Sequence, residues 1–154
     1  MDQRTPYAVV TSVEPPRPVT KRQLVRLSRQ LELAAMAGPP GTIAATLQDA
    51  RFLTDRTRDV YCRLAAAGAA VTLLARGLQS WLAPGVRGVD LAEDDPLVDE
   101  WVVVLHGALP SVLVATDLHR AGAVDLERDF AYATSRDPGL VAACADLLAG
   151  TRAG

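Results

Sequence analysis

The sequence is poor in the residues that carry the commonest chemistry of small proteins. Its 154 residues include two cysteines, two histidines and only seven aromatic side chains (two Trp, three Tyr and two Phe). Two cysteines cannot make a disulfide framework, so nothing in the composition indicates a secreted protein. Lysine is nearly absent as well, because the 16 basic residues are 15 arginines and Lys21. This bias is typical of a GC-rich genome, and we expect most of the arginines on a solvated surface.

Signals of membrane insertion, export and nucleic-acid binding are missing too. No stretch of about 18 apolar residues is present that could span a membrane, and the first ten residues hold no apolar run typical of a leader peptide. The formal net charge is −2, whereas dedicated nucleic-acid binders usually carry a basic excess. We therefore expect a cytoplasmic protein that contacts neither membranes nor nucleic acids directly.

Motifs for catalysis and for metal or phosphate binding are equally scarce. There is no nucleophile elbow, and the glycine-rich loop at residues 38–41 contains two prolines, which lack the N–H groups that would bind an anion. His106 and His119 lie 13 residues apart, without the spacing of a zinc-binding helix. We expect no metal and no cofactor. Cys144 lies on the apolar stripe of a predicted helix, where a buried and inert thiol is usual, whereas a reactive role for Cys62 stays open.

Apolar periodicity and helix caps predict a single α+β domain. Three helices are expected within residues 20–38, 54–68 and 137–150, because each of these segments starts with a capping residue and ends at a glycine. Residues 100–106 and 111–116 are β-branched runs joined by a four-residue turn, which predicts an antiparallel hairpin. The economical architecture is a mixed, mainly antiparallel sheet of five to six strands packed by about three helices. This outline is shared by sensor domains of the GAF and PAS type.

Weaker signals complete the expected layout. Residues 42–47, 70–74, 86–91 and 129–134 are further strand candidates, and residues 78–82 are expected to form a short turn of helix. Residues 1–18 are expected to hold a strand (residues 7–12) and a proline-rich lead-in. Residues 19–150 would then form the domain, and residues 151–154 a tail.

The candidate binding residues are basic and aromatic. Arg51 and Phe52 precede the second predicted helix, Arg56 opens it, and Tyr61 follows. An arginine and an aromatic ring near a helix N-terminus can bind an anionic or planar ligand. The alternative is that the rings belong to the core and the arginines face water. The full candidate set for ligand binding is Arg51, Phe52, Arg56, Tyr61, Trp101 and His106.

Three segments together resemble a known family. They are residues 42–77 (TIAATLQDARFLTDRTRDVYCRLAAAGAAVTLLARG), 94–118 (DDPLVDEWVVVLHGALPSVLVATDL) and 129–148 (DFAYATSRDPGLVAACADLL). Their order and spacing resemble the DICT sensory domain, which is named for its occurrence in diguanylate cyclases and two-component systems. The resemblance covers residues 19–150 and implies a cytoplasmic sensory module of a stand-alone, actinobacterial type. It brings no catalytic residues, and it implies an output through a partner protein or through self-association.

Three functions stay open on the sequence alone. The first is a non-enzymatic sensor that binds a small ligand or a partner protein in signal transduction or transcriptional control. The second is a dimeric interaction scaffold without a small-molecule ligand, since a homodimer is the commonest closed assembly. Its apolar sheet face would consist of Val102, Val104, Val112 and Val114. The third is an enzyme that uses Glu100, His106 and Asp117 as an acid–base set, which requires these side chains to converge.

Overall fold

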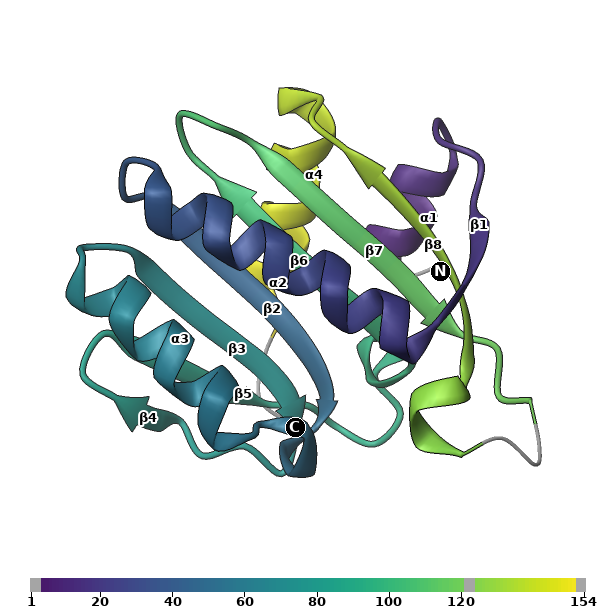
Figure 1. Ribbon diagram of the computed structural model, residues 1–154, viewed down its shortest axis with the longest axis horizontal. Helices are drawn as coiled ribbons and strands as arrows, with labels where there is room; N and C mark the ends of the chain where they lie inside the picture. Colours follow the sequence, from purple (N-terminus) through teal and green to yellow (C-terminus); the bar gives the residue numbers. More distant parts are fainter. Residues whose placement is uncertain (1–3, 121–123, 152–154) are drawn as a thin grey trace.

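The computed structural model describes residues 4–120 and 124–151 as one mixed sheet with helices on both faces (Figure 1). The strand order in the sheet is β1-β8-β7-β6-β2-β3-β5-β4. Only the β2–β3 and β3–β5 pairs are parallel, so the sheet is largely antiparallel, as predicted. The strands are β1 (Arg17–Thr20), β2 (Thr42–Asp49), β3 (Ala70–Arg76), β4 (Trp81–Ala83), β5 (Val86–Asp90), β6 (Glu100–His106), β7 (Ser111–Asp117) and β8 (Asp129–Ser135).

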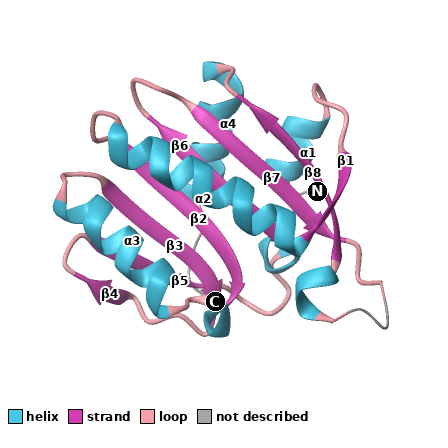
Figure 2. Cartoon of the chain, in the orientation of Figure 1, coloured by secondary structure: helices cyan, strands magenta, loops and turns pink. Residues whose placement is uncertain are grey.

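Two helices cover each face of the sheet. In Figure 1, α2 (Lys21–Ala37) and α3 (Asp55–Ala66) lie in front of the sheet, whereas α1 (Pro6–Thr11) and α4 (Pro138–Ala149) lie behind it. Figure 2 marks the same two layers by secondary structure. The connections also contain three short 3-10 turns, η1 (Ala50–Phe52), η2 (Pro96–Asp99) and η3 (Asp125–Glu127).

The predicted helix caps are present and explain where the helices begin. The Thr20 hydroxyl accepts a hydrogen bond from the Gln23 backbone N–H at 3.3 Å, and the Gln23 side chain accepts one from the Thr20 N–H at 3.0 Å, which completes the expected capping box. The Thr54 hydroxyl caps α3 by accepting a hydrogen bond from the Thr57 backbone N–H at 3.2 Å. Asp137 caps α4, with Pro138 at its first position.

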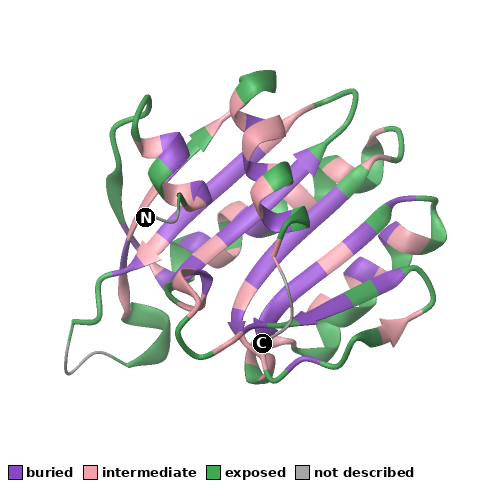
Figure 3. Ribbon diagram, turned by 180° about the vertical axis from the view of Figure 1, so that it is seen from behind, coloured by how far each residue is buried: buried purple, intermediate pink, exposed green. Residues whose placement is uncertain are grey.

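Two apolar cores lie on the two faces of the sheet. The front core packs α2 and α3 on alternating residues of the strands, with Phe130 and Leu24 fully buried. The rear core packs α1 and α4 on the other face of β6, β7 and β8 and includes Val10 and Val141. Cys144 belongs to this core, as predicted, and burial raises the pKa of its thiol to about 11. The buried strand positions form continuous stripes when the sheet is viewed from behind (Figure 3).

The N-terminal segment differs from the sequence-based expectation. Residues 6–11 form α1 instead of a strand, because the Thr5 hydroxyl caps the segment, Pro6 occupies the first turn, and Val9 and Val10 pack into the rear core. This tertiary burial overrides the strand preference of two adjacent valines. The proline-rich segment ends in edge strand β1, so the expected boundary after residue 18 falls inside a strand.

Four further expectations need correction or comment. The sheet has eight strands instead of five to six, since both edges are extended by the short strands β1 and β4. Residues 81–83 form β4, where a turn of helix was expected at residues 78–82. The four valines of β6 and β7 are fully or almost fully buried beneath α1 and α4, so they do not leave an apolar sheet face exposed. Of the expected tail, residues 152–154 lie outside the described residues.

Candidate functional site

The six candidate ligand-binding residues do not form one group. Arg51 and Phe52 lie together in η1, directly after β2. His106 ends β6 and pairs with Thr42, the first residue of β2, so it lies at the opposite end of the sheet. We call the end at η1 the ionic end and the end at His106 the cavity end.

The other three candidates lie between these two ends. Tyr61 is 2% exposed in the front core, where burial raises the pKa of its hydroxyl. Trp101 is half-buried beneath α2 and donates its indole N–H to the Ser28 hydroxyl at 2.8 Å. Arg56 lies exposed in the first turn of α3. For Tyr61 and Trp101, the structure therefore shows packing roles in the core.

The ionic end is organised around the ring of Phe52. The Lys21 ammonium lies 3.8 Å from the ring centroid, and the guanidinium carbons of Arg51 and Arg128 lie at 4.9 Å and 5.6 Å. Cations at such distances are attracted by the negative face of an aromatic ring. Three cations converge on this one ring, although the sequence places only Arg51 next to it.

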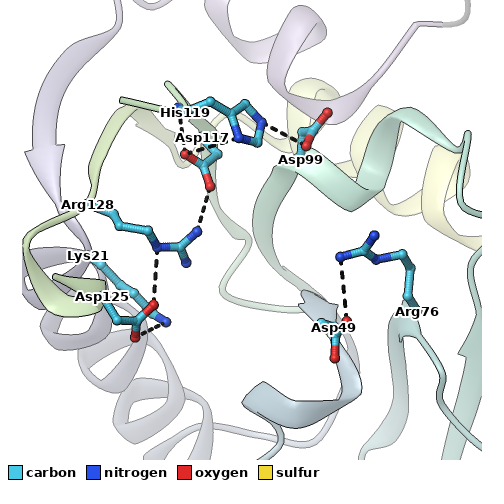
Figure 4. A network of polar contacts seen from close by, with 8 residues as sticks. All are labelled: Lys21, Asp49, Arg76, Asp99, Asp117, His119, Asp125 and Arg128. Carbon is cyan, nitrogen blue, oxygen red and sulfur yellow. Dashed lines mark hydrogen bonds and ion pairs between the residues drawn. The ribbon is translucent and has the colours of Figure 1, made fainter. Parts of the chain in front are cut away.

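Carboxylates already pair with most of these cations (Figure 4). Lys21 donates a hydrogen bond to Asp125 at 2.7 Å, and Arg128 donates one to Asp117, also at 2.7 Å. Burial lowers the pKa of Lys21 although Asp125 favours its charged form, and the Lys21 hydrogen bond lowers the pKa of Asp125. These pairs fasten η3 to the start of α2 and to the end of β7. The chemistry of this end is therefore that of a structural clasp.

Further ion pairs continue the clasp along this edge of the sheet. His119 lies 2.9 Å from Asp99, and Arg76 lies 3.5 Å from Asp49 at the ends of β3 and β2. The Arg76 Nε atom and the Arg128 Nη2 atom are buried without a hydrogen-bond partner among the described residues. The Arg128 guanidinium also faces the Phe130 ring at 5.4 Å, so much of its environment is aromatic.

The proposed acid–base set does not converge. Glu100 and His106 are the first and last residues of β6, which separates their Cα atoms by about 20 Å. Glu100 accepts a hydrogen bond from the Tyr7 backbone N–H at 3.0 Å, and burial raises the pKa of its carboxyl. Asp117 is held by Arg128. These three residues cannot act on one substrate atom. Among the described residues, no three potential metal ligands lie together.

A cavity of about 430 Å³ occupies the other end of the sheet. Its walls are the last turns of α2 and α3, the loop of residues 38–41 and the hairpin between β6 and β7. All of these elements meet at the upper left of Figure 1. The size lies within the range of about 300–1,000 Å³ that is usual for small-molecule sites. Most of the lining side chains are Ala, Gly, Pro and Leu, so the cavity is mainly apolar.

Small residues explain why space is left at this end. Both helices end in alanine-rich turns, which reach the proline-containing loop without large side chains to fill the corner. The loop touches the hairpin closely, because a Cβ atom on Gly41 would lie 2.8 Å from the His106 carbonyl oxygen. Met36 and Leu109 lie at the rim with 42% and 69% of their surface exposed. The cavity thus has an apolar mouth.

Of the residues that line this cavity, only His106 is among the candidates that the sequence predicts. The glycine-rich loop was assessed there only as a phosphate cradle, a role its prolines disfavour. A usable signal was the coincidence of two alanine-rich helix ends with glycine–proline turns. Lys21 and Arg128 were also missed, although a sole lysine at a helix start is visible in the sequence.

Most of the chain matches the model of a known protein family. A family model described as DICT, a sensory domain in diguanylate cyclases and two-component systems, matches residues 7–118. That range includes all but the first residue of α1, both front helices α2 and α3, and both strands of the hairpin. A search of curated proteins returned no match at the significance threshold.

Solved structures share the fold at low sequence identity. A polyphosphate kinase from Porphyromonas gingivalis aligns with 86% of this chain at a TM-score of 0.58 and 17% identity, and the aligned part is 22% of that enzyme. NucT from Helicobacter pylori aligns with 88% of this chain and 94% of its own, at a TM-score of 0.51 and 8% identity. At such identities the likeness concerns the fold alone. None of the described helices combines the length and apolar character that a membrane crossing requires.

Proposed function

This chain belongs to the DICT family of sensory domains, and on that premise we propose that it senses a small molecule in the cavity and passes the signal to a partner protein in the cytoplasm. The family match supports the sensory role. The cavity of about 430 Å³ is the single observation that carries the ligand-binding part of the proposal. The proposed module is not an enzyme.

The position of the cavity suits a sensor. Three segments distant in sequence line it, namely the end of α2, the end of α3 and the β6–β7 hairpin. A ligand between them would contact all three and would favour the arrangement that fits it best. A partner protein could then recognise the changed position of the α2 end or of the exposed hairpin on the protein surface.

Native mass spectrometry of the protein purified from its own host tests this proposal. We expect a bound small molecule on the wild type and its loss in Ala34→Trp, because Ala34 lines the cavity and an indole would occupy it. Ala37→Trp is the matched control, since Ala37 is exposed on the same helix, as Ala34 is, but does not line the cavity. Wild-type protein without any bound molecule, or Ala34→Trp that keeps it, would contradict the proposal.

A homodimeric scaffold without a small ligand is the second candidate. Trp81 favours it, because this large side chain is 66% exposed on β4, the last strand at its edge of the sheet. Light scattering decides: a wild-type dimer that becomes a monomer in Trp81→Ser would support an edge-to-edge scaffold. A wild-type monomer at high protein concentration would remove this candidate.

A further inference from the structure

Polar residues of the cavity lie on adjacent strands at the cavity end of the sheet. Thr42 at the start of β2 pairs with His106, the last residue of β6. Ser111 at the start of β7 pairs with Leu105, next to His106. Arg136 directly follows Ser135, the last residue of β8, which pairs with Val112. Neighbouring strands lie about 4.8 Å apart, so these four residues form one row across adjacent strands, but strand side chains alternate between the two faces of the sheet. Ser111 shares the front face with its partner Leu105, which is the face of the cavity. Thr42 and His106 share the rear face with Ala44 and Val104, and they also line a smaller pocket there.

Every member of this row can donate a hydrogen bond, and none is an acid. The cavity lining contains two arginines and one histidine but no Asp or Glu, although the chain has 18 acidic residues. Arg63, on the helix side of the cavity, already pairs with Asp59 at 3.1 Å. No ion pair to a described residue occupies Arg136. On the front face, Arg136 therefore offers an available cation beside the Ser111 hydroxyl.

The opposite wall has the reverse character. It consists of the last turns of α2 and α3, with small and aliphatic side chains such as Leu31, Ala34, Leu64 and Ala67. The carbonyl groups at a helix C-terminus carry partial negative charge, which disfavours an anion there. The anionic group of a ligand would therefore lie at the strand ends, and its apolar group would lie between α2 and α3.

From this arrangement we propose that the cavity takes an amphipathic anion, with its carboxylate or similar group at Ser111 and Arg136 and its hydrocarbon part against α2 and α3. The inference rests on the proposed function and names the chemical class of its ligand. Arg136 supplies the charge-assisted hydrogen bond that separates an anion from a neutral molecule of the same length.

Calorimetric titration of the full chain tests the class with three probes that share one alkyl chain. They are decanoate and decyltrimethylammonium, each used below its critical micelle concentration, and decanol, used below its solubility limit. We expect decanoate to bind most tightly, about tenfold more tightly than decanol, because a hydrogen bond to a charged group is lost in the alcohol. The cationic probe is expected to bind most weakly. The arginines of the lining repel it, and the hydrogen-bond donors find no acceptor on it.

Variants locate the charge. Arg136→Met is expected to weaken decanoate binding about tenfold and to leave decanol binding unchanged. Arg63→Met is expected to change decanoate binding much less, because Arg63 is engaged by Asp59. Arg26→Met is the control for net charge, since Arg26 is exposed on α2 and does not line the cavity.

The outcomes separate this inference from the proposed function. Equal binding of decanol and decanoate, or tighter binding of the cation, would overturn the anionic class while leaving a ligand-binding cavity in place. Loss of decanoate binding in Arg63→Met but not in Arg136→Met would overturn the orientation. Decanoate binding that survives Ala34→Trp would show a site outside the cavity and would contradict both proposals.

Discussion

The two ends of the sheet differ in residue type, since charged side chains gather at one end and small apolar residues at the other. At the ionic end, charged side chains from α2, β7 and the η3 segment form ion pairs with one another, and Lys21 is only 5% exposed there. At the cavity end, the same sheet stops against small and apolar side chains, and about 430 Å³ is left open. The same helix, α2, begins in the clasp and ends at the cavity.

This contrast teaches how one small domain can combine a fixed and an adaptable part. Each of these ion pairs has one nearly buried partner, Lys21 or Asp117, and a short hydrogen bond. Such a pair holds one geometry, because loss of the partner leaves a buried charge without compensation. Contacts between alanine, glycine and proline residues hold the structure less firmly, so a ligand can rearrange these residues at a low cost in free energy. We therefore assign rigidity to the ionic end and signal reception to the cavity end.

Asp117→Ala breaks the ionic end and is expected to have the largest effect. The Asp117 side chain is 4% exposed and accepts hydrogen bonds from Arg128 at 2.7 Å and from the His119 backbone N–H at 2.8 Å. Removal leaves a largely buried guanidinium short of one partner, which should lower the free energy of unfolding by about 3 kcal/mol. Urea denaturation measures this loss.

Asp129→Ala is the matched control at the same end. Its pair with Arg120 spans 3.3 Å between exposed side chains, so its removal should cost about 0–1 kcal/mol. If both variants lost the same small amount, the clasp would not be a source of rigidity.

Gly41→Ala disturbs the packing between the loop and the hairpin at the cavity end without adding a polar group. The new methyl group would lie 2.8 Å from the His106 carbonyl oxygen, so the loop and the hairpin must move apart. We expect a loss of about 1–2 kcal/mol, typical of overpacking, together with altered ligand binding. Gly38→Ala in the same loop is the control, because its methyl group would meet its neighbours at 3.4 Å or more. A wild-type melting temperature in Gly41→Ala would show that this contact does not shape the cavity.

Glu32 on α2 lies between the two ends and gives the smallest expected effect. Burial raises the pKa of its carboxyl to about 6, with Arg29 and Arg56 acting in the opposite direction. The folded state then binds this proton more tightly than the unfolded state. The contribution to stability is full below the ordinary pKa of 4.5 and is lost as the pH rises through about 6.

Glu32→Gln removes this pH dependence. Because the carboxyl is partly solvated, we expect the variant to be more stable than the wild type by about 1 kcal/mol at pH 7 and to gain little at pH 4. Urea denaturation at several pH values between 4 and 7 measures the difference. A variant that is less stable at pH 7 would show that Glu32 is held by a favourable ion pair instead.

Local signals made much of the fold predictable. The capping pair Thr20 and Gln23, the Asp137–Pro138 start of α4 and the turn at residues 107–110 each act within a few residues, and all three are present as predicted. The strand expected at residues 7–12 was wrong, because its helix depends on burial against α4, far away in sequence.

The sites were less predictable for the same reason. Lys21 meets Asp125 across 104 positions of sequence, and no local pattern links the two. Arg51 and Phe52 were found because they are adjacent, yet their cationic neighbours come from α2 and from the segment before β8. The cavity is a gap between ends of elements, so it has no motif of its own. Its residues are recognisable only once α2, α3 and the hairpin are assembled.

Hydrogen–deuterium exchange with and without decanoate tests the central claim, that the cavity end receives the ligand and the ionic end stays fixed. We expect slower exchange on binding at residues 31–43 and 105–111, with unchanged exchange at residues 50–52 and 124–130. Slower exchange confined to residues 50–52 and 124–130 would contradict it, because the ligand would then bind at the ring of Phe52.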